Sequence, residues 1–149
     1  MKRSEAVISI HSEFGYDQPE SESVEFTTDG FYSYEGDSCS MGYFETEVTG
    51  MPGTFTSFLV SPEEMMVDRK GSITSSMIFK EGLKDTVMYQ TPYGYARMGI
   101  NTRKIKSSIE PDRARIEIDY VVNMEHVVAM RNRFTISVEK QEDTQQWPI

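Results

Sequence analysis

The sequence predicts an all-β domain whose short antiparallel strands follow one another and close into a barrel or a sandwich. Two observations lead to this prediction: turn signals recur at short intervals from Phe26 to Val138, and the segments between them alternate apolar with polar residues. This combination is typical of a meander in which each strand pairs with the next one. The turn signals are Asp29-Gly30, Glu35-Gly36-Asp37, Met51-Pro52-Gly53, Ser61-Pro62, Lys70-Gly71, Glu81-Gly82, Pro92-Tyr93-Gly94, Glu110-Pro111-Asp112 and Asn123-Met124-Glu125.

The positions of these signals place the expected strands. Asp29-Gly30 is a strong hairpin signal and separates two short strands. Ser61-Pro62 also fits a helix start, but Lys70-Gly71 follows too soon for more than about two helical turns, which favours a tight turn and a strand. Gly42 is a candidate β-bulge inside its strand. Strands are expected at residues 6–14, 24–28, 31–35, 39–48, 54–60, 65–68, 73–80, 85–91, 95–106, 113–122 and 126–139.

The last expected hairpin shows which side chains face the core. Pairing across Asn123-Met124-Glu125 gives an apolar face and a charged face, because opposite residues of antiparallel strands share a face. The expected pairs are Tyr120 with Val128, Ile118 with Met130, and Ile116 with Asn132. The core face then holds Ile116, Ile118, Tyr120, Val128, Met130, Asn132, Phe134 and Ile136. On the other face, Glu117 opposes Arg131 in an exposed pair worth only about 0.2–1 kcal/mol.

The preceding strand, residues 95–106, admits two registers. One turns Ala96, Met98, Ile100 and Thr102 inward, with Thr102 opposite Tyr120. A slip by one residue turns Arg97 and Arg103 inward instead. Burying two unpaired arginines costs several kcal/mol each, so the first register is favoured unless the barrel holds an anion.

Bulk composition limits the partners. With 149 residues, the chain is long enough for one domain with a core of its own. The formal net charge of −9 argues against nucleic acid and against an anionic membrane surface as partners. Cys39 is the single cysteine, and we find no apolar run of signal-peptide or membrane-helix length, so we expect a cytoplasmic protein. We expect one domain at residues 1–140 and a polar, disordered tail at 141–149, in which only Trp147 has the character to dock.

The sequence contains no recognisable set of catalytic or metal-binding residues. His11 and His126 lie far apart and have no second ligand at metal spacing, so no metal and no cofactor are expected. Cys39 has neither histidine nor asparagine near it in the sequence and is interpreted as a buried, unreactive thiol. Glu45 is one of many acidic residues and is expected at the surface. We therefore expect a protein that is not an enzyme.

A longer pattern resembles a known family. The segment from Asp85 to Thr102 contains Tyr89-Gln90-Thr91-Pro92-Tyr93-Gly94, and shorter matches lie at residues 43–45, 69–71 and 79–82. Over about residues 6–140 the chain resembles the YwiB-like family of small bacterial proteins, whose domain has no known function. The resemblance implies a lipocalin-like (calycin-like) antiparallel up-and-down β-barrel of about 8–10 strands in a bacterial cytoplasm. It implies no activity, ligand or catalytic residue.

Two features of the inner face suggest a site. The chain has ten methionines, a residue that fills core gaps and also lines adaptable pockets. Asn132 is a polar residue on an otherwise apolar face, and its partners are other side chains, a trapped water or a ligand. We therefore predict a small apolar or amphipathic ligand inside the barrel. The candidate cavity residues are Met98, Thr102, Tyr120, Met130 and Asn132.

The alternative is an interaction protein whose barrel is filled by side chains. Its functional surface is then an exposed strand edge or an aromatic patch near Tyr93, Tyr95 and Trp147, and a homodimer is the simplest assembly. Both hypotheses depend on the interior of the barrel, because a filled interior leaves no room for a ligand.

Overall fold

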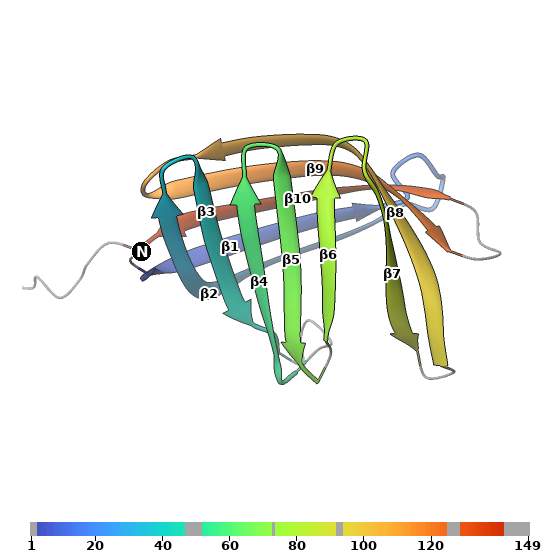
Figure 1. Ribbon diagram of the computed structural model, residues 1–149, viewed down its shortest axis with the longest axis horizontal. Coiled ribbons are helices and arrows are strands. Elements are labelled where there is room, and N and C mark those ends of the chain that lie inside the picture. Colours follow the sequence, from blue (N-terminus) through green and yellow to red (C-terminus); the bar gives the residue numbers. More distant parts are fainter. Residues whose placement is uncertain (1–2, 47–51, 73, 92–93, 125–128, 142–149) are drawn as a thin grey trace, which may run out of the picture.

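The computed structural model describes residues 3–46, 52–72, 74–91, 94–124 and 129–141, and these form ten strands in one antiparallel sheet (Figure 1). Nothing is described of the remaining residues, among them His126, Val128, Tyr93 and Trp147. The strands are β1 Arg3–Phe14, β2 Glu22–Glu35, β3 Ser38–Phe44, β4 Thr54–Ser61, β5 Glu64–Gly71, β6 Ser75–Lys80, β7 Lys84–Thr91, β8 Gly94–Ile109, β9 Arg113–Met124 and β10 Met130–Lys140.

The strands form a nearly closed up-and-down barrel. Their order in the sheet is β6-β5-β4-β3-β2-β1-β10-β9-β8-β7, so each strand pairs with its neighbour in sequence except at the β6–β7 step. The first and last strands pair with each other and join the two halves of the sheet. In Figure 1, β3 to β6 form a wall of steep strands in front of β1, β9 and β10. The predicted all-β antiparallel barrel of 8–10 strands is confirmed.

The barrel has one seam, between β6 and β7. At its upper end the turn is held by backbone bonds from Gly82 N to Thr102 O, at 3.0 Å, and from Thr102 N to Leu83 O, at 3.2 Å. Below the turn, Asp85 Oδ2 accepts a hydrogen bond from the backbone N–H of Ile78 at 3.1 Å. From there β6 and β7 diverge, as Figure 1 shows. Both therefore end the sheet as edge strands within the described part of the chain.

The expected hairpin at Asp29-Gly30 is wrong, because β2 runs through both residues without a break. Gly30 lacks the positive φ of a turn glycine. It is required for a close approach instead: a Cβ on Gly30 would lie 2.3 Å from the carbonyl oxygen of Gly42 and 2.6 Å from Cδ1 of Ile8. A glycine inside a strand has this second meaning, and the sequence signal does not separate it from a turn.

The bulge is also placed differently from its prediction. Gly42 keeps regular pairing with Phe31, whose ring lies 2.9 Å from the position a Cβ would take. The ladder between β8 and β9 shifts register between Thr102 and Lys104 instead. An extra residue in one strand reverses the facing of the residues beyond it. The favoured register therefore holds up to Thr102, and beyond the bulge Ile105 opposes the buried Ile118.

The favoured register also keeps the two arginines outside. Thr102 is opposite Tyr120, as expected, and both Ile100 and Thr102 are buried. Arg97 and Arg103 are exposed. The side chain of Ala96 lies outside the described residues.

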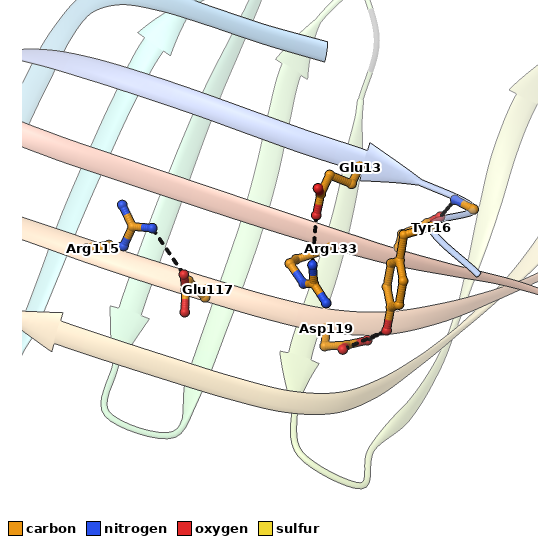
Figure 2. Close-up of polar contacts among 8 residues, drawn as sticks. Glu13, Tyr16, Arg115, Glu117, Asp119 and Arg133 are labelled. Carbon is orange, nitrogen blue, oxygen red and sulfur yellow. Dashed lines mark hydrogen bonds and ion pairs between the residues drawn. The ribbon is translucent and has the colours of Figure 1, made fainter. Parts of the chain in front are cut away.

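The register predicted for the last hairpin is wrong, although its faces are correct. Asn132 pairs with Tyr120, Phe134 with Ile118 and Ile136 with Ile116, so the connection is longer than a tight turn. The shift is by an even number of residues, which leaves the described side chains on their predicted faces, whereas Val128 lies outside the described residues. The expected pair of Glu117 with Arg131 is absent: Glu117 pairs instead with Arg115, with 3.1 Å between Oε1 and Nη2 (Figure 2).

The core is made by the inward residues of alternating strands. Ile8, Met41, Met65 and Ile136 are fully buried, and Tyr32 is 1% exposed with its hydroxyl donating to the carbonyl of Glu110 at 2.6 Å. Strands from residue 3 to residue 140 share the one sheet. Beyond them Gln141 N donates to Glu5 O at 2.9 Å, and the predicted tail from 142 onward lies outside the described residues. No helix capable of crossing a membrane occurs in the described segments.

Because Gly30 lies so close to its neighbours, we expect an added methyl group at this position to lower the stability of the fold. We expect Gly30→Ala to destabilise the barrel by about 1–3 kcal/mol, because the backbone of Gly42 cannot yield as a side chain can. Gly99→Ala is the matched control, since its Cβ would meet neighbours at 3.6 and 3.7 Å, an ordinary contact. Its effect should stay within about 0.5 kcal/mol. Urea unfolding of the two variants measures both, and equal stabilities would contradict the close approach.

Candidate functional site

The barrel encloses a cavity on the side of the seam. Its volume is about 430 Å³, inside the range of about 300–1,000 Å³ that small-molecule sites occupy. Its walls come from the end of β1, from β4 to β6 and from β8 to β10. They are mostly apolar: Phe14, Phe58, Met65, Val67, Met77, Phe79, Met98, Ile100, Val122, Met130 and Phe134, with Ser12, Arg69, Tyr120 and Asn132 as the polar members.

The structure brings four of the five predicted residues around this cavity. Met98, Tyr120, Met130 and Asn132 all line it, from β8, β9 and β10. Thr102 is not among the lining residues. It is 1% exposed and lies opposite Tyr120, and its Oγ1 is buried without a hydrogen-bond partner in the described part of the chain. That these residues contact a ligand stays a prediction.

Asn132 has protein partners for its amide. Its Oδ1 accepts a hydrogen bond from the backbone N–H of Gly15 at 3.0 Å, which ties the chain after β1 to β10. Burial raises the pKa of Tyr120, while a hydrogen bond with Asn132 and the charge of Arg69 oppose that rise. Asn132 therefore has a structural role at this end of the cavity, because a buried backbone N–H without an acceptor is costly.

Side chains on the outer face hold the same corner in place (Figure 2). Arg133 Nη1 lies 3.0 Å from Oε2 of Glu13, and its guanidinium carbon lies 4.5 Å from the ring centre of Tyr16. The Tyr16 hydroxyl donates to Asp119, 2.9 and 2.8 Å from the two carboxylate oxygens. Burial and this hydrogen bond raise the pKa of Tyr16. The segment after β1 is thus fastened to β9 and β10 beside Phe14 and Met130 of the cavity.

Sequence reasoning assigned no role to Arg69, which lines the cavity from β5. It belongs to a polar row that crosses four adjacent strands in register: Tyr43 of β3 opposes Thr56 of β4, Thr56 opposes Arg69, and Arg69 opposes Ser75 of β6. Thr56 is fully buried, and Tyr43 is 4% exposed. Directly opposed residues of a sheet have Cβ atoms only about 4.5–5.5 Å apart, so the row forms one polar band on the inner wall.

The expected exposure of Glu45 is wrong, because this carboxylate lies inside the barrel at 5% exposure. Its backbone N–H donates to Thr54 O at 2.8 Å, and Oε2 accepts a hydrogen bond from Thr56 Oγ1 at 3.0 Å. Burial raises the pKa of Tyr43, and the charge of Glu45 and a hydrogen bond to it raise it further. Glu45 thus joins the polar band at the Thr56 end.

The other candidate chemistry stays separate from the cavity. Cys39 is 5% exposed, and burial raises the pKa of its thiol to about 11 despite a hydrogen bond with Tyr32. Neither Cys39 nor His11 lines the cavity. Within the described segments, no three histidine, cysteine or acidic side chains gather as a metal site would require.

Comparison with known proteins places this architecture in a family. Residues 8–136 match the model of a domain of unknown function, DUF1934. The chain belongs to the DUF1934 family. It is similar to the uncharacterised β-barrel protein YwiB of Bacillus subtilis (strain 168), with 26% identity over 123 residues that cover 83% of this chain and 85% of the relative. It also resembles the crystal structure of YwiB from Bacillus subtilis, with a TM-score of 0.77 and 25% identity over 94% of both chains.

The polar band of this DUF1934 chain follows from simple strand parity. Met65, Val67 and Arg69 alternate in one strand, and Cys39, Met41, Tyr43 and Glu45 alternate along another. Continuing either alternation by one step turns the charged residue inward. The expectation that charged residues face solvent outweighed this signal for Glu45. The expected strand at residues 65–68 stops before Arg69, whereas β5 continues to Gly71.

Asn132 allows a test of its structural role. We expect Asn132→Ala to destabilise the protein by about 1–3 kcal/mol, because it leaves the buried N–H of Gly15 without its acceptor. Amide hydrogen exchange at Gly15 should accelerate in this variant. Asn123→Ala, at an exposed position of β9, is the control and should change stability by less than about 0.5 kcal/mol. Unchanged exchange at Gly15 would show that Asn132 does not hold this corner.

Proposed function

We propose that this barrel binds one small apolar or amphipathic molecule in its interior, as a binding protein without catalytic activity. The observation that supports it is the cavity of about 430 Å³ behind the seam, with aromatic and methionine walls and a few polar side chains. Sites for small molecules have this composition, in which apolar walls supply the affinity and few polar groups fix orientation.

Packing energetics favour an occupied interior. The side chains around an empty apolar cavity lose dispersion contacts that a close-packed core retains. A ligand restores these contacts, and each Å² of apolar surface that it removes from water contributes about 25 cal/mol. Met65, Met77, Met98 and Met130 come from four different strands of the wall. Their flexible side chains suit a cavity that adapts to its occupant.

The described residues of the cavity wall do not combine into a catalytic group of nucleophile, acid and base. A nucleophile next to a base, or an acid and base pair, is the minimum for most hydrolytic and transfer chemistry. In the described part of the wall, Arg69, Tyr120, Asn132 and Ser12 are the polar side chains, and they include no carboxylate, histidine or thiol. We therefore propose binding rather than turnover. A single cysteine suits a reducing compartment, and we propose the bacterial cytoplasm as its location.

Filling the cavity from within tests the proposal. Freshly purified protein should show a bound mass by native mass spectrometry, or a thermal shift with decanol as a probe. Val122→Phe places a ring in the cavity wall and should weaken decanol binding at least tenfold. Leu59→Phe adds the same ring at an outward position that is 50% exposed, and it should bind as the unmodified protein does. Failure of decanol and of every copurified molecule to bind would refute the proposed function.

A second candidate function is self-association through an aromatic cluster on the outer wall. Phe31, Phe44 and Phe55 pack against one another with ring centres 5.7 Å apart for Phe31 and Phe55 and 4.8 Å apart for Phe44 and Phe55. Phe44 is 72% exposed. Exposed aromatic groups are enriched at protein interfaces, and the packing of three rings against one another supports this patch.

Light scattering tests this interface. If the cluster joins two copies, the protein should have the mass of a dimer at micromolar concentration and Phe44→Ser should have the mass of a monomer. Met88→Ser removes an apolar side chain that is 55% exposed on the distant β7, so it should leave the dimer intact. A monomeric unmodified protein, or a dimer that survives Phe44→Ser, would exclude this interface.

A further inference from the structure

Arg69 is a permanent charge on the wall of a largely apolar cavity, and its side chain is half-buried. Its Nε is buried and has no hydrogen-bond partner among the described residues, and no described carboxylate forms an ion pair with it. Arginine cannot release its proton to avoid this situation, unlike a buried lysine or histidine. Among the described residues, the Arg69 guanidinium thus has no carboxylate within ion-pair distance.

Such an arrangement is costly, which calls for a physical reason. A buried donor atom of a charged group is normally paired, and leaving it without an acceptor is unfavourable. Outward facing was available to this chain, because Arg97 and Arg103 are exposed on β8. Arg69 instead continues the inward alternation of Met65 and Val67. The one arginine of the cavity wall is therefore the group to which an anion would bind.

The groups around Arg69 limit which kind of anion can bind there. Thr56, directly opposite Arg69, holds the buried carboxylate of Glu45 through a hydrogen bond of 3.0 Å. The charge of Glu45 raises the pKa of Tyr43 and the charge of Arg69 lowers it, so both charged groups lie near Tyr43. On the cavity side, the charge of Arg69 also lowers the pKa of Tyr120, which is another polar residue of the cavity wall.

We propose that Arg69 binds the carboxylate of an amphipathic monocarboxylic acid whose apolar chain fills the methionine- and phenylalanine-lined part of the cavity. This inference rests on the proposed function and names its ligand class. A guanidinium matches a carboxylate through two parallel hydrogen bonds, and Nε is one of the donors in that geometry. The ligand would satisfy the donor that the protein leaves unpaired.

A singly charged head fits better than other head groups. Glu45 places a second carboxylate near Arg69, and Coulomb repulsion in a poorly solvated interior penalises a phosphate dianion more than a monoanion. A cationic head would face the guanidinium directly. A neutral head would leave Nε without a charged acceptor. The apolar walls then require that most of the ligand be hydrocarbon.

Isothermal titration with decanoate and decanol tests this inference. The two probes share one chain and differ in the head group. We expect the unmodified protein to bind decanoate about 10- to 100-fold more tightly, the range that hydrogen bonds to a charged group support. Arg69→Gln should remove this preference while decanol binding remains, and Arg69→Lys should retain part of it. Arg97→Gln removes an equal charge from the outer face and should keep the full preference.

The outcomes separate the two proposals. Equal binding of decanoate and decanol, or a preference unchanged in Arg69→Gln, would overturn the role of Arg69 and leave the binding function intact. Binding of neither probe would overturn the role of Arg69, and it would overturn the binding function as well if no copurified molecule is found. A spectroscopic measurement covers the case in which Arg69→Gln fails to fold: the Nε–H resonance of Arg69 in the unmodified protein should shift on addition of decanoate. A resonance that decanoate leaves in place, while the cavity methyl groups respond, would also overturn the inference.

Discussion

The pairing of β1 with β10 is the constraint on which the barrel depends. Every other ladder joins strands that follow each other in sequence, whereas this one joins Ala6 to Lys140 and Phe14 to Asn132 across most of the chain. Loop-closure entropy grows only slowly with length, so one long-range ladder is affordable once its inner face is apolar. Ile8 and Ile10 of β1 and Ile136 and Val138 of β10 supply that face. Folding should therefore be limited by this contact and not by the local hairpins.

Because β1 pairs with β10 inside the sheet, the two unpaired edges of the described sheet belong to β6 and β7, which follow each other in the sequence. The β1–β10 ladder moves the two free edges to β6 and β7, which a short turn connects and a few hydrogen bonds hold together at one end. The cavity lies on this side: β6 and β8 contribute to its wall, and β2, β3 and β7 contribute no described residue. Thus the topology that closes the barrel at its termini also decides where its interior is least filled, and both proposals follow from that placement.

Strand parity could be predicted from the sequence, and pairing register could not. The inward positions of Ile116, Ile118 and Ile136 follow from alternation, which survives any even shift of register. Local turn signals gave the wrong partner for Asn132, because a longer connection and a tight turn look alike when both contain asparagine and glutamate. Gly30 was interpreted as a turn residue, since only the folded sheet brings the Gly42 carbonyl and Ile8 against it. The bulge after Thr102 has no local sequence signal.

The inward facing of Arg69 and Glu45 was not predicted, and the reason lies in the rule used for charged residues. Composition rules predict that charged residues face water, and they hold for Arg97 and Arg103 but fail for Arg69 and Glu45. In the described chain, the buried side-chain atoms without a partner are Glu45 Oε1, Arg69 Nε and Thr102 Oγ1, and all three belong to inward-facing residues. Unpaired polar atoms on inward-facing residues oppose folding stability, and departures of this kind are expected at functional sites. The structural alternative is a charge pair between Arg69 and Glu45, which both lie beside Thr56. The unpaired atoms Arg69 Nε and Glu45 Oε1 argue against such a pair.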